Sequence, residues 1–281
     1  MRDAAATARE TCRIQATTNS SGGAAGIVLS LGPYGATTSP SCEFAPTYSA
    51  PFGPPSSVED AEAALAQWHY ARLSVYASNS ETWGMVDAVA FETLGLLCEV
   101  RAVRRAMYAL EGDGVQAKPW WISCTFPGPD GVFPDPTVAP DSAMKEVVSA
   151  VLQNAPELAA PTGIGINCTP SKFVVPLSVH LRKAVEELYP DKPPWAVIYP
   201  NGGHFDTDKC AWSPNDAPLW ASQVVVACSN LLSSTPRERA VFSRIILGGC
   251  CNVSAGDVAV LAGAVIGAGF VSGPSGGTVN L

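Results

Sequence analysis

Three cysteines in this chain stand at the ends of two short apolar stretches. The run Ile245–Leu247 is followed by two glycines and then by Cys250 and Cys251, and residues 163–167 lead in the same way into Cys168. Such runs are typical of strands buried on both faces of a parallel sheet, and α/β folds carry their chemistry at the carboxyl ends of these strands. Three thiols at that edge form a soft ligand set, which predicts a metal site and favours zinc.

Other roles for these cysteines compete with the metal site. A single cysteine is usually a small buried apolar residue. The adjacent pair Cys250 and Cys251 could also form a strained vicinal disulfide, or could consist of one buried and one idle thiol. The matching position of Cys168 at the end of a second strand favours the metal site over these alternatives.

Composition limits the class of protein and its partners. The 281 residues suit one large α/β domain, and the 47% hydrophobic and 15% charged content indicates a large core rather than a disordered chain. A formal net charge of −8 argues against nucleic acid and anionic membranes as partners. An odd number of cysteines, nine in all, predicts free or metal-bound thiols in a reducing compartment, and so a cytoplasmic protein. No apolar run reaches 18 residues and no secretory signal is evident, so we expect no membrane span. The sequence does not predict an oligomeric state.

Apolar runs alternate with helical patterns along the chain, which predicts a parallel sheet. We expect six strands, at residues 26–32, 85–91, 120–126, 163–167, 195–199 and 244–248. The Pro- and Ser-rich segment 33–57 is too long for a plain connection. It is either a functional loop over a strand end or a disordered insertion. The tail 272–281 is expected to be loose.

Six motifs, in this order along the chain, resemble those of the homocysteine S-methyltransferase family. They are Ser-Leu-Gly-Pro-Tyr-Gly-Ala (30–36), Phe-Glu-Thr (91–93), Trp-Ile-Ser (121–123), Gly-Ile-Asn-Cys-Thr (165–169), Tyr-Pro-Asn-Gly-Gly (199–203) and Gly-Gly-Cys-Cys (248–251). The resemblance runs from about residue 24 to residue 269. It implies a (β/α)8 TIM-type barrel and a zinc ion held by Cys168, Cys250 and Cys251.

The chain departs from the family at its start. A closed barrel of this type has eight strands, and about six β/α units are expected here. Family members normally have an Asp-Gly-Gly strand and a second strand before the Gly-Pro-Tyr-Gly motif, and neither is found in the sequence. Residues 1–281 are therefore expected to form a single homocysteine-binding-type barrel domain that is incomplete at its N-terminus.

The resemblance implies a zinc-dependent methyltransferase. Its reaction moves a methyl group from a sulfonium donor, S-methylmethionine or S-adenosylmethionine, to the thiol of homocysteine, giving methionine. A carboxylate at a strand end can bind an ammonium group, which suggests Glu92 for the substrate amino group, although Glu92 could also be a helix N-terminal acid. Asn167 and Asn201 either orient the site, bind substrate or stabilise turns.

A second hypothesis is a truncated, catalytically inactive relative that still binds zinc or serves only as a partner for another chain. The expected loss of the opening strands favours it, as does Asn252, because the family usually has arginine after its two cysteines. The intact cysteine triad favours the enzyme. His204, near the expected mouth of the barrel, is the only histidine that merits a test, and Tyr34 and Trp212 are candidates for cation–π contact with the sulfonium.

Overall fold

The computed structural model has a parallel sheet at its centre. It describes residues 2–18, 25–128, 131–189, 191–206, 208–232, 240–270 and 278–280. Seven strands in this part of the chain pair in the order β1-β2-β3-β4-β5-β8-β9, with every pair parallel. They are β1 (Val28–Leu31), β2 (Ala88–Leu94), β3 (Trp120–Cys124), β4 (Gly163–Pro170), β5 (Trp195–Asn201), β8 (Arg244–Leu247) and β9 (Thr278–Asn280).

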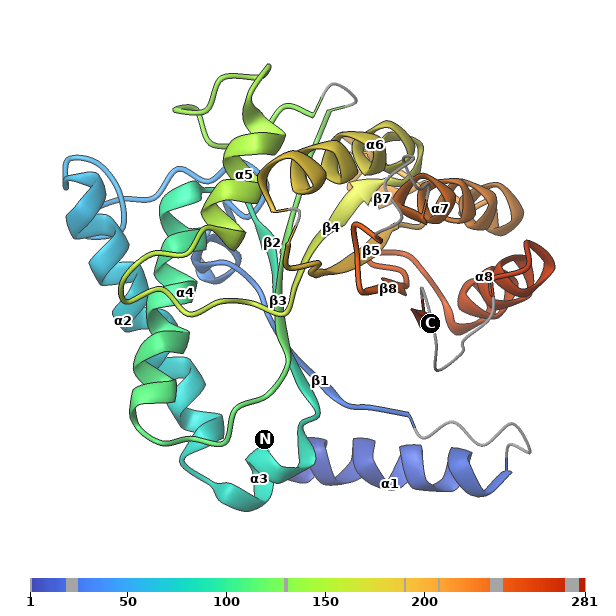
Figure 1. Cartoon of the computed structure of the whole chain (residues 1–281), viewed down its shortest axis with the longest axis horizontal. Coiled ribbons are helices and arrows are strands. Elements are labelled where there is room, and N and C mark those ends of the chain that lie inside the picture. The colour runs from blue at the N-terminus through green and yellow to red at the C-terminus, as the bar shows by residue number, and fades with distance from the viewer. Residues whose placement is uncertain are drawn as a thin grey trace.

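Helices alternate with these strands along the described parts of the chain. They are α1 (Arg2–Thr18), α2 (Val58–Ala77), α3 (Ser80–Met85), α4 (Leu97–Gly112), α5 (Ala143–Leu152), α6 (Ser171–Leu188), α7 (Ala217–Leu232) and α8 (Ala255–Gly267), with a short 3-10 helix at Tyr34–Thr37. Figure 1 shows them in an arc around the sheet from α2 and α4, through α5, α6 and α7, to α8. Each helix in this arc packs on the next. A parallel sheet with helices around its outside is consistent with a TIM-type barrel, as predicted.

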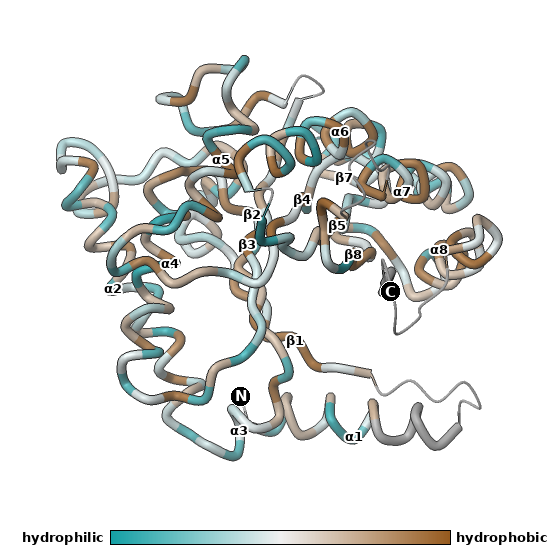
Figure 2. The backbone as a smooth tube through the Cα atoms, viewed as in Figure 1, coloured by the Kyte–Doolittle hydropathy of each residue, from teal (hydrophilic) through white to brown (hydrophobic). Residues whose placement is uncertain are grey.

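Side-chain alternation divides the core into two layers. Phe91 and Ile122 point outward into the main core beneath the helices. Trp121 and Val197 point to the opposite face, where Tyr199 packs against them. The hydrophobic colouring along β8 and much of α8 in Figure 2 follows the apolar runs that predicted these elements. Glu92 follows Phe91 in β2, so the same alternation directs its carboxylate to the inner face.

Two regions differ from the sequence-based expectations. The tail was expected to be loose, but Thr278 pairs with Arg244 and Asn280 with Ile246, so that β9 extends the sheet at β8. The β-branched residues at 278 and 279 suit an added edge strand. The rest of the tail lies outside the described residues. β2 also runs three residues further than expected, to Leu94.

The segment 33–57 is ordered, so the prediction of a disordered insertion is wrong. Its Tyr48 side chain is only 6% exposed and packs with Leu65 and Ala102 beneath the loop. Further along the chain, the segment between β5 and α7 contains a small hairpin of β6 (Phe205–Asp206) and β7 (Ala211–Trp212). Among the described helices, none combines the length and apolar character needed to span a bilayer.

Candidate metal centre

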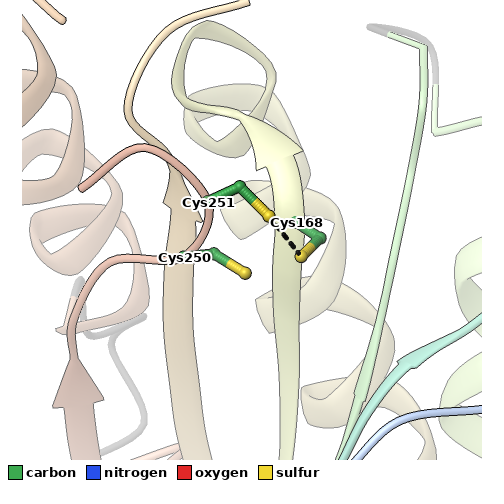
Figure 3. Close-up of side chains that lie close together, drawn as sticks. All are labelled: Cys168, Cys250 and Cys251. Carbon is green, nitrogen blue, oxygen red and sulfur yellow. Dashed lines mark hydrogen bonds between the residues drawn. The ribbon is translucent and has the colours of Figure 1, made fainter. Parts of the chain in front are cut away.

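The structure brings Cys168, Cys250 and Cys251 together at one edge of the sheet. Cys168 lies near the end of β4, whereas Cys250 and Cys251 lie in the segment that follows β8 (Figure 3). The Sγ atoms of Cys168 and Cys251 are 3.8 Å apart, and all three sulfurs lie within 4.8 Å of one another. Because β5 stands between β4 and β8 in the sheet, the two cysteine segments meet across the end of β5.

Backbone geometry accounts for this meeting. Cys168 has a positive φ of 47°, and the pairing of β4 with β5 shifts register just after Asn167, so the chain leaves the regular alternation there. On the other side, the backbone N–H of Cys250 donates to Pro200 O over 2.9 Å, and Gly202 N–H donates to Cys251 O over 2.8 Å. These bonds fix the segment after β8 against the end of β5.

The glycine before the cysteine pair is required for this approach. A Cβ atom at Gly249 would overlap the side chain of Val253, which folds back over the segment. A larger residue at this position would push the two cysteines away from Cys168.

The three thiols fit a zinc ion. Zinc–sulfur bonds of about 2.3 Å in a tetrahedral arrangement place two sulfurs roughly 3.8 Å apart. The separation of Cys168 and Cys251 has this value, and contraction by about an ångström would bring in the most distant sulfur of the set. Three thiolates suit zinc by their softness and leave one of its four positions for another ligand.

The thiols also influence one another's ionisation. Hydrogen bonds from Cys168 and Cys250 lower the pKa of Cys251. Hydrogen bonding to Cys250 and Cys251, together with burial, raises the pKa of Cys168. One thiolate therefore forms readily within the cluster, and the remaining protons would be displaced when a metal binds.

Asn167 connects the cysteine cluster to β2. Its Oδ1 accepts a 2.9 Å hydrogen bond from the backbone N–H of Thr93, and its Nδ2 donates to Thr93 Oγ1 over 2.8 Å. The same Nδ2 lies 3.9 Å from Cys250 Sγ. Asn167 is fully buried and Thr93 has a positive φ of 61°. This geometry suits the predicted orienting role better than direct binding of substrate.

Glu92 lies half-buried on the inner face of β2. The hydroxyl of Ser30 in β1 donates a hydrogen bond to its Oε1. Across the inner face, burial raises the pKa of the Tyr199 phenol, and the charge of Glu92 raises it further. Because β2 continues to Leu94 and α4 begins only at Leu97, the interpretation of Glu92 as a helix N-terminal acid is wrong.

The other predicted residues lie in or beside the loops around the site. Asn201 ends β5 and is buried, and within the described structure its Oδ1 has no hydrogen-bond partner. Asn252 has a positive φ of 61° and donates hydrogen bonds to Gly202 O and, over 3.1 Å, to Ser213 O. The residue that replaces the family's usual arginine therefore stabilises the loop between β5 and α7. His204 donates its backbone N–H to Ser213 Oγ.

The two candidate cation–π residues are engaged with other rings. Tyr34 packs in an aromatic cluster with Tyr48 and Phe52, at centroid distances of 5.1 and 4.1 Å. Trp212 packs against Phe205 at 5.4 Å, within the hairpin of β6 and β7. These contacts support ordinary packing for both residues.

A buried carboxylate that no sequence motif indicated holds the segment 33–57. Glu99 in α4 is fully buried, and its Oε1 accepts hydrogen bonds from Tyr34 N–H over 2.7 Å and from His69 Nε2 over 3.0 Å. Its Oε2 accepts the hydroxyl of Tyr48 over 2.7 Å. Arg72 donates to His69 Nδ1, which fixes the histidine tautomer, and also to Gly32 O. The segment is thus held over the ends of β1 and β2.

A parallel sheet that gathers three thiols at the carboxyl ends of its strands defines a TIM-type α/β protein with a candidate metal centre. The chain belongs to the homocysteine S-methyltransferase family, whose model matches residues 1–265. This confirms the resemblance that the six motifs indicated.

Curated relatives agree with this assignment. Homocysteine S-methyltransferase 2 of Arabidopsis thaliana is 30% identical over 190 residues, which cover 67% of this chain and 47% of the relative. Homocysteine S-methyltransferase 4 of Zea mays is 27% identical over 240 residues, covering 85% and 58%. Selenocysteine Se-methyltransferase of Brassica oleracea var. italica is 28% identical over 190 residues, covering 67% and 45%. The chain spans about half the length of the curated relatives it matches.

Proposed function

We propose that this protein transfers a methyl group from a sulfonium donor, S-methylmethionine or S-adenosylmethionine, to the thiol of homocysteine, giving methionine. The observation that carries the proposal is the convergence of three cysteine sulfurs within 4.8 Å at the strand ends of a member of this family. Because these thiols are free, we also propose that the protein acts in a reducing compartment, the cytoplasm.

Different residues of the chain bind the metal, orient its ligands and bind the substrate. Cys168, Cys250 and Cys251 would hold zinc, which when bound lowers the pKa of the substrate thiol and keeps it as a thiolate. Asn167 orients Cys250 through its contact with that sulfur. Glu92 binds the ammonium group of homocysteine by a charge-assisted hydrogen bond.

The transfer itself is a displacement at carbon. The homocysteine sulfur forms a bond to the methyl carbon while the bond from that carbon to the donor sulfur breaks. The bonding electrons stay on the donor sulfur, which becomes a neutral thioether, and the thiol proton leaves to solvent. Positioning of the two sulfurs in line with the methyl carbon supplies much of the acceleration.

The competing proposal is a catalytically inactive relative that still binds zinc or serves only as a partner for another chain. The loop-stabilising use of Asn252, where the family usually has arginine, favours it. An inactive relative that still binds zinc would match the enzyme in metal content, so zinc content alone does not separate the two proposals. Methyl transfer separates them directly.

The test combines metal analysis with an assay. Elemental analysis of the purified chain is expected to find about one zinc per chain, and this zinc is lost in Cys251→Ser. Formation of methionine from homocysteine is then measured with each sulfonium donor. Cys98→Ser is the matched control, because Cys98 lies at the start of α4 outside the cluster. Zinc without methyl transfer would support the inactive relative that still binds zinc. A folded protein without zinc would overturn the enzyme and leave only the role of a partner for another chain.

A further inference from the structure

A small cavity lies between the start of α6 and the segment that leads into α7. The two helices pack side by side (Figure 1). The cavity has a volume of about 250 Å³, and its lining includes Ser171 and Lys172 of α6, His204 and Asp216 of the segment after β5, and Trp220 of α7. None of the three cysteines of the metal centre lines it, so it is a separate feature of the same end of the sheet.

The N-terminus of α6 opens onto this cavity without a side-chain cap. The residue before the helix is Pro170, which makes no side-chain hydrogen bond to the first turn. The first N–H groups of a helix have no partner within the helix, and the helix dipole places partial positive charge there. The start of α7 differs, because Asp216 Oδ1 accepts the N–H of Leu219 over 3.1 Å. The uncapped donors beside the cavity therefore come from α6.

Trp220 brings a buried donor to the same cavity. The residue is only 2% exposed, and its Nε1–H has no hydrogen-bond partner among the described residues. The indole N–H only donates, and buried donors in native proteins almost always have an acceptor. An oxygen atom of a ligand in the cavity would be such an acceptor.

Lys172 gives the cavity a positive charge. Its side chain is exposed, and the ammonium group lies 5.0 Å from the centre of the Phe173 ring. No carboxylate forms an ion pair with this lysine in the parts of the chain that the structure describes. Asp216 is the single acid among the described lining residues, and one of its oxygens already caps α7. A helix N-terminus, an ammonium group and an indole N–H together suit a small oxyanion.

We propose that this cavity binds an oxyanion through the N-terminus of α6, Lys172 and Trp220. Its volume lies just below the usual range for small-molecule sites, about 300–1,000 Å³, which suits a small anion. One source of the oxyanion is the α-carboxylate that homocysteine and its proposed sulfonium donors share, because Ser171 follows Cys168 by three residues. The other source is a free phosphate ion bound beside the metal centre.

The test measures the binding of inorganic phosphate by titration calorimetry at constant ionic strength. Lys172→Met removes the charge and keeps the apolar stem, and Trp220→Phe keeps an aromatic ring but removes the N–H. We expect the Kd for phosphate to rise about tenfold in each variant. Lys172→Arg keeps the charge and is expected to retain most of the affinity. Lys183→Met, at an exposed lysine further along α6, is the matched control and should bind phosphate as the wild type does.

Competition with methionine separates the two sources, because methionine carries the α-carboxylate of the proposed substrates. If that carboxylate occupies the cavity, methionine displaces phosphate from the wild type. The KM for homocysteine or for the donor then rises in Lys172→Met while kcat stays unchanged. If the cavity takes free phosphate, the Kd for phosphate is the same with saturating methionine, and Lys172→Met leaves both KM values unchanged. Either result supports the oxyanion site.

The binding measurements do not depend on methyl transfer, so they remain decisive if the proposed function fails. Lys172 is exposed, so Lys172→Met is expected to fold even if Trp220→Phe does not. If neither phosphate nor methionine binds, the inference is overturned. Affinities that are equal in the wild type, Lys172→Met and Lys183→Met would also overturn it, and so would an equal loss in both lysine variants.

Discussion

The hydroxyl of Tyr48 donates a 2.7 Å hydrogen bond to Oε2 of Glu99, joining two buried residues that are 51 positions apart. The other oxygen of this carboxylate accepts the backbone N–H of Tyr34. One buried side chain in α4 therefore holds the long loop at two points. The order of the loop depends on this carboxylate rather than on secondary structure, which the loop has only in the 3-10 turn at Tyr34–Thr37.

Tyr48→Phe should loosen the loop. It leaves the ring packing in place but removes a donor from a fully buried carboxylate, so the free energy of unfolding is expected to fall by about 1–3 kcal/mol. Urea denaturation measures this change, and hydrogen exchange should show faster exchange within residues 33–57. Tyr108→Phe, at a half-exposed position on α4, is the control and should change neither. Unchanged stability and protection in Tyr48→Phe would contradict the role given to Glu99.

The sequence predicted those parts of the molecule that depend on local pattern. The buried apolar runs and the rule that parallel strands align their carboxyl ends were enough to predict six strands and to place Cys168 beside Cys250 and Cys251. Motif matches led to Glu92, whose position inside β2 required the structure because strand ends are poorly marked in sequence.

Other features had no pattern from which to predict them. The contacts of Glu99 with Tyr34, Tyr48 and His69 join positions 30 to 65 residues apart. In the sequence alone, each of these three residues would be interpreted as an ordinary packing residue. The aperiodic segment 33–57 follows a course that depends on those contacts. β9 is only three residues long, too short for its sequence alone to predict it, and it pairs with β8.

Asn167→Ala should weaken zinc binding. The variant loses both hydrogen bonds to Thr93 and the contact with Cys250 Sγ, so that sulfur is no longer held in place. Loss of such an orienting group typically reduces metal affinity about 10- to 100-fold. Competition with a chromophoric zinc chelator measures the affinity. Asn230→Ala serves as the control, because Asn230 bonds to Val175 O and Ser178 Oγ in α6, away from the cysteines. Equal affinities in the two variants would argue against an orienting role.

Gly165→Ala should prevent stable folding. A Cβ atom on Gly165 would lie 2.5 Å from Ser123 Oγ and would overlap the carbonyl oxygen of Val197, which belongs to the neighbouring strand β5. The carbonyl oxygen of Val197 cannot move without disturbing the sheet, so we expect little soluble protein or a large fall in melting temperature. Gly263→Ala in α8 is the opposite case, because a Cβ there meets nothing within 4 Å. That variant should be more stable by up to about 1 kcal/mol. Thermal melts of both variants measure these changes in stability. A stable Gly165→Ala protein would show that the inner face of β4 accommodates a methyl group and would contradict the prediction.

His69 should make the stability of the fold sensitive to acid. The residue is fully buried, donates to Glu99 and accepts a hydrogen bond from Arg72 over 2.8 Å. Burial lowers the pKa of His69 below its ordinary value of 6.5; the hydrogen bond to Glu99 opposes this shift and the charge of Arg72 adds to it. The unfolded chain therefore binds a proton below about pH 6.5 that the folded chain does not, and the free energy of unfolding should fall as pH decreases through that range.

The expected slope from this one histidine approaches about 1.4 kcal/mol per pH unit below pH 6 and vanishes above pH 7.5. Urea denaturation at intervals between pH 5.5 and 8 measures it in the wild type and in His69→Gln. The variant should be less stable at pH 8, because it loses the ring that packs against Phe91, but its stability should depend less steeply on pH. His180→Gln removes an exposed histidine from α6 and should keep the wild-type slope. If His69→Gln keeps the full slope, the acid sensitivity arises elsewhere and the neutral, buried state of His69 is not its cause.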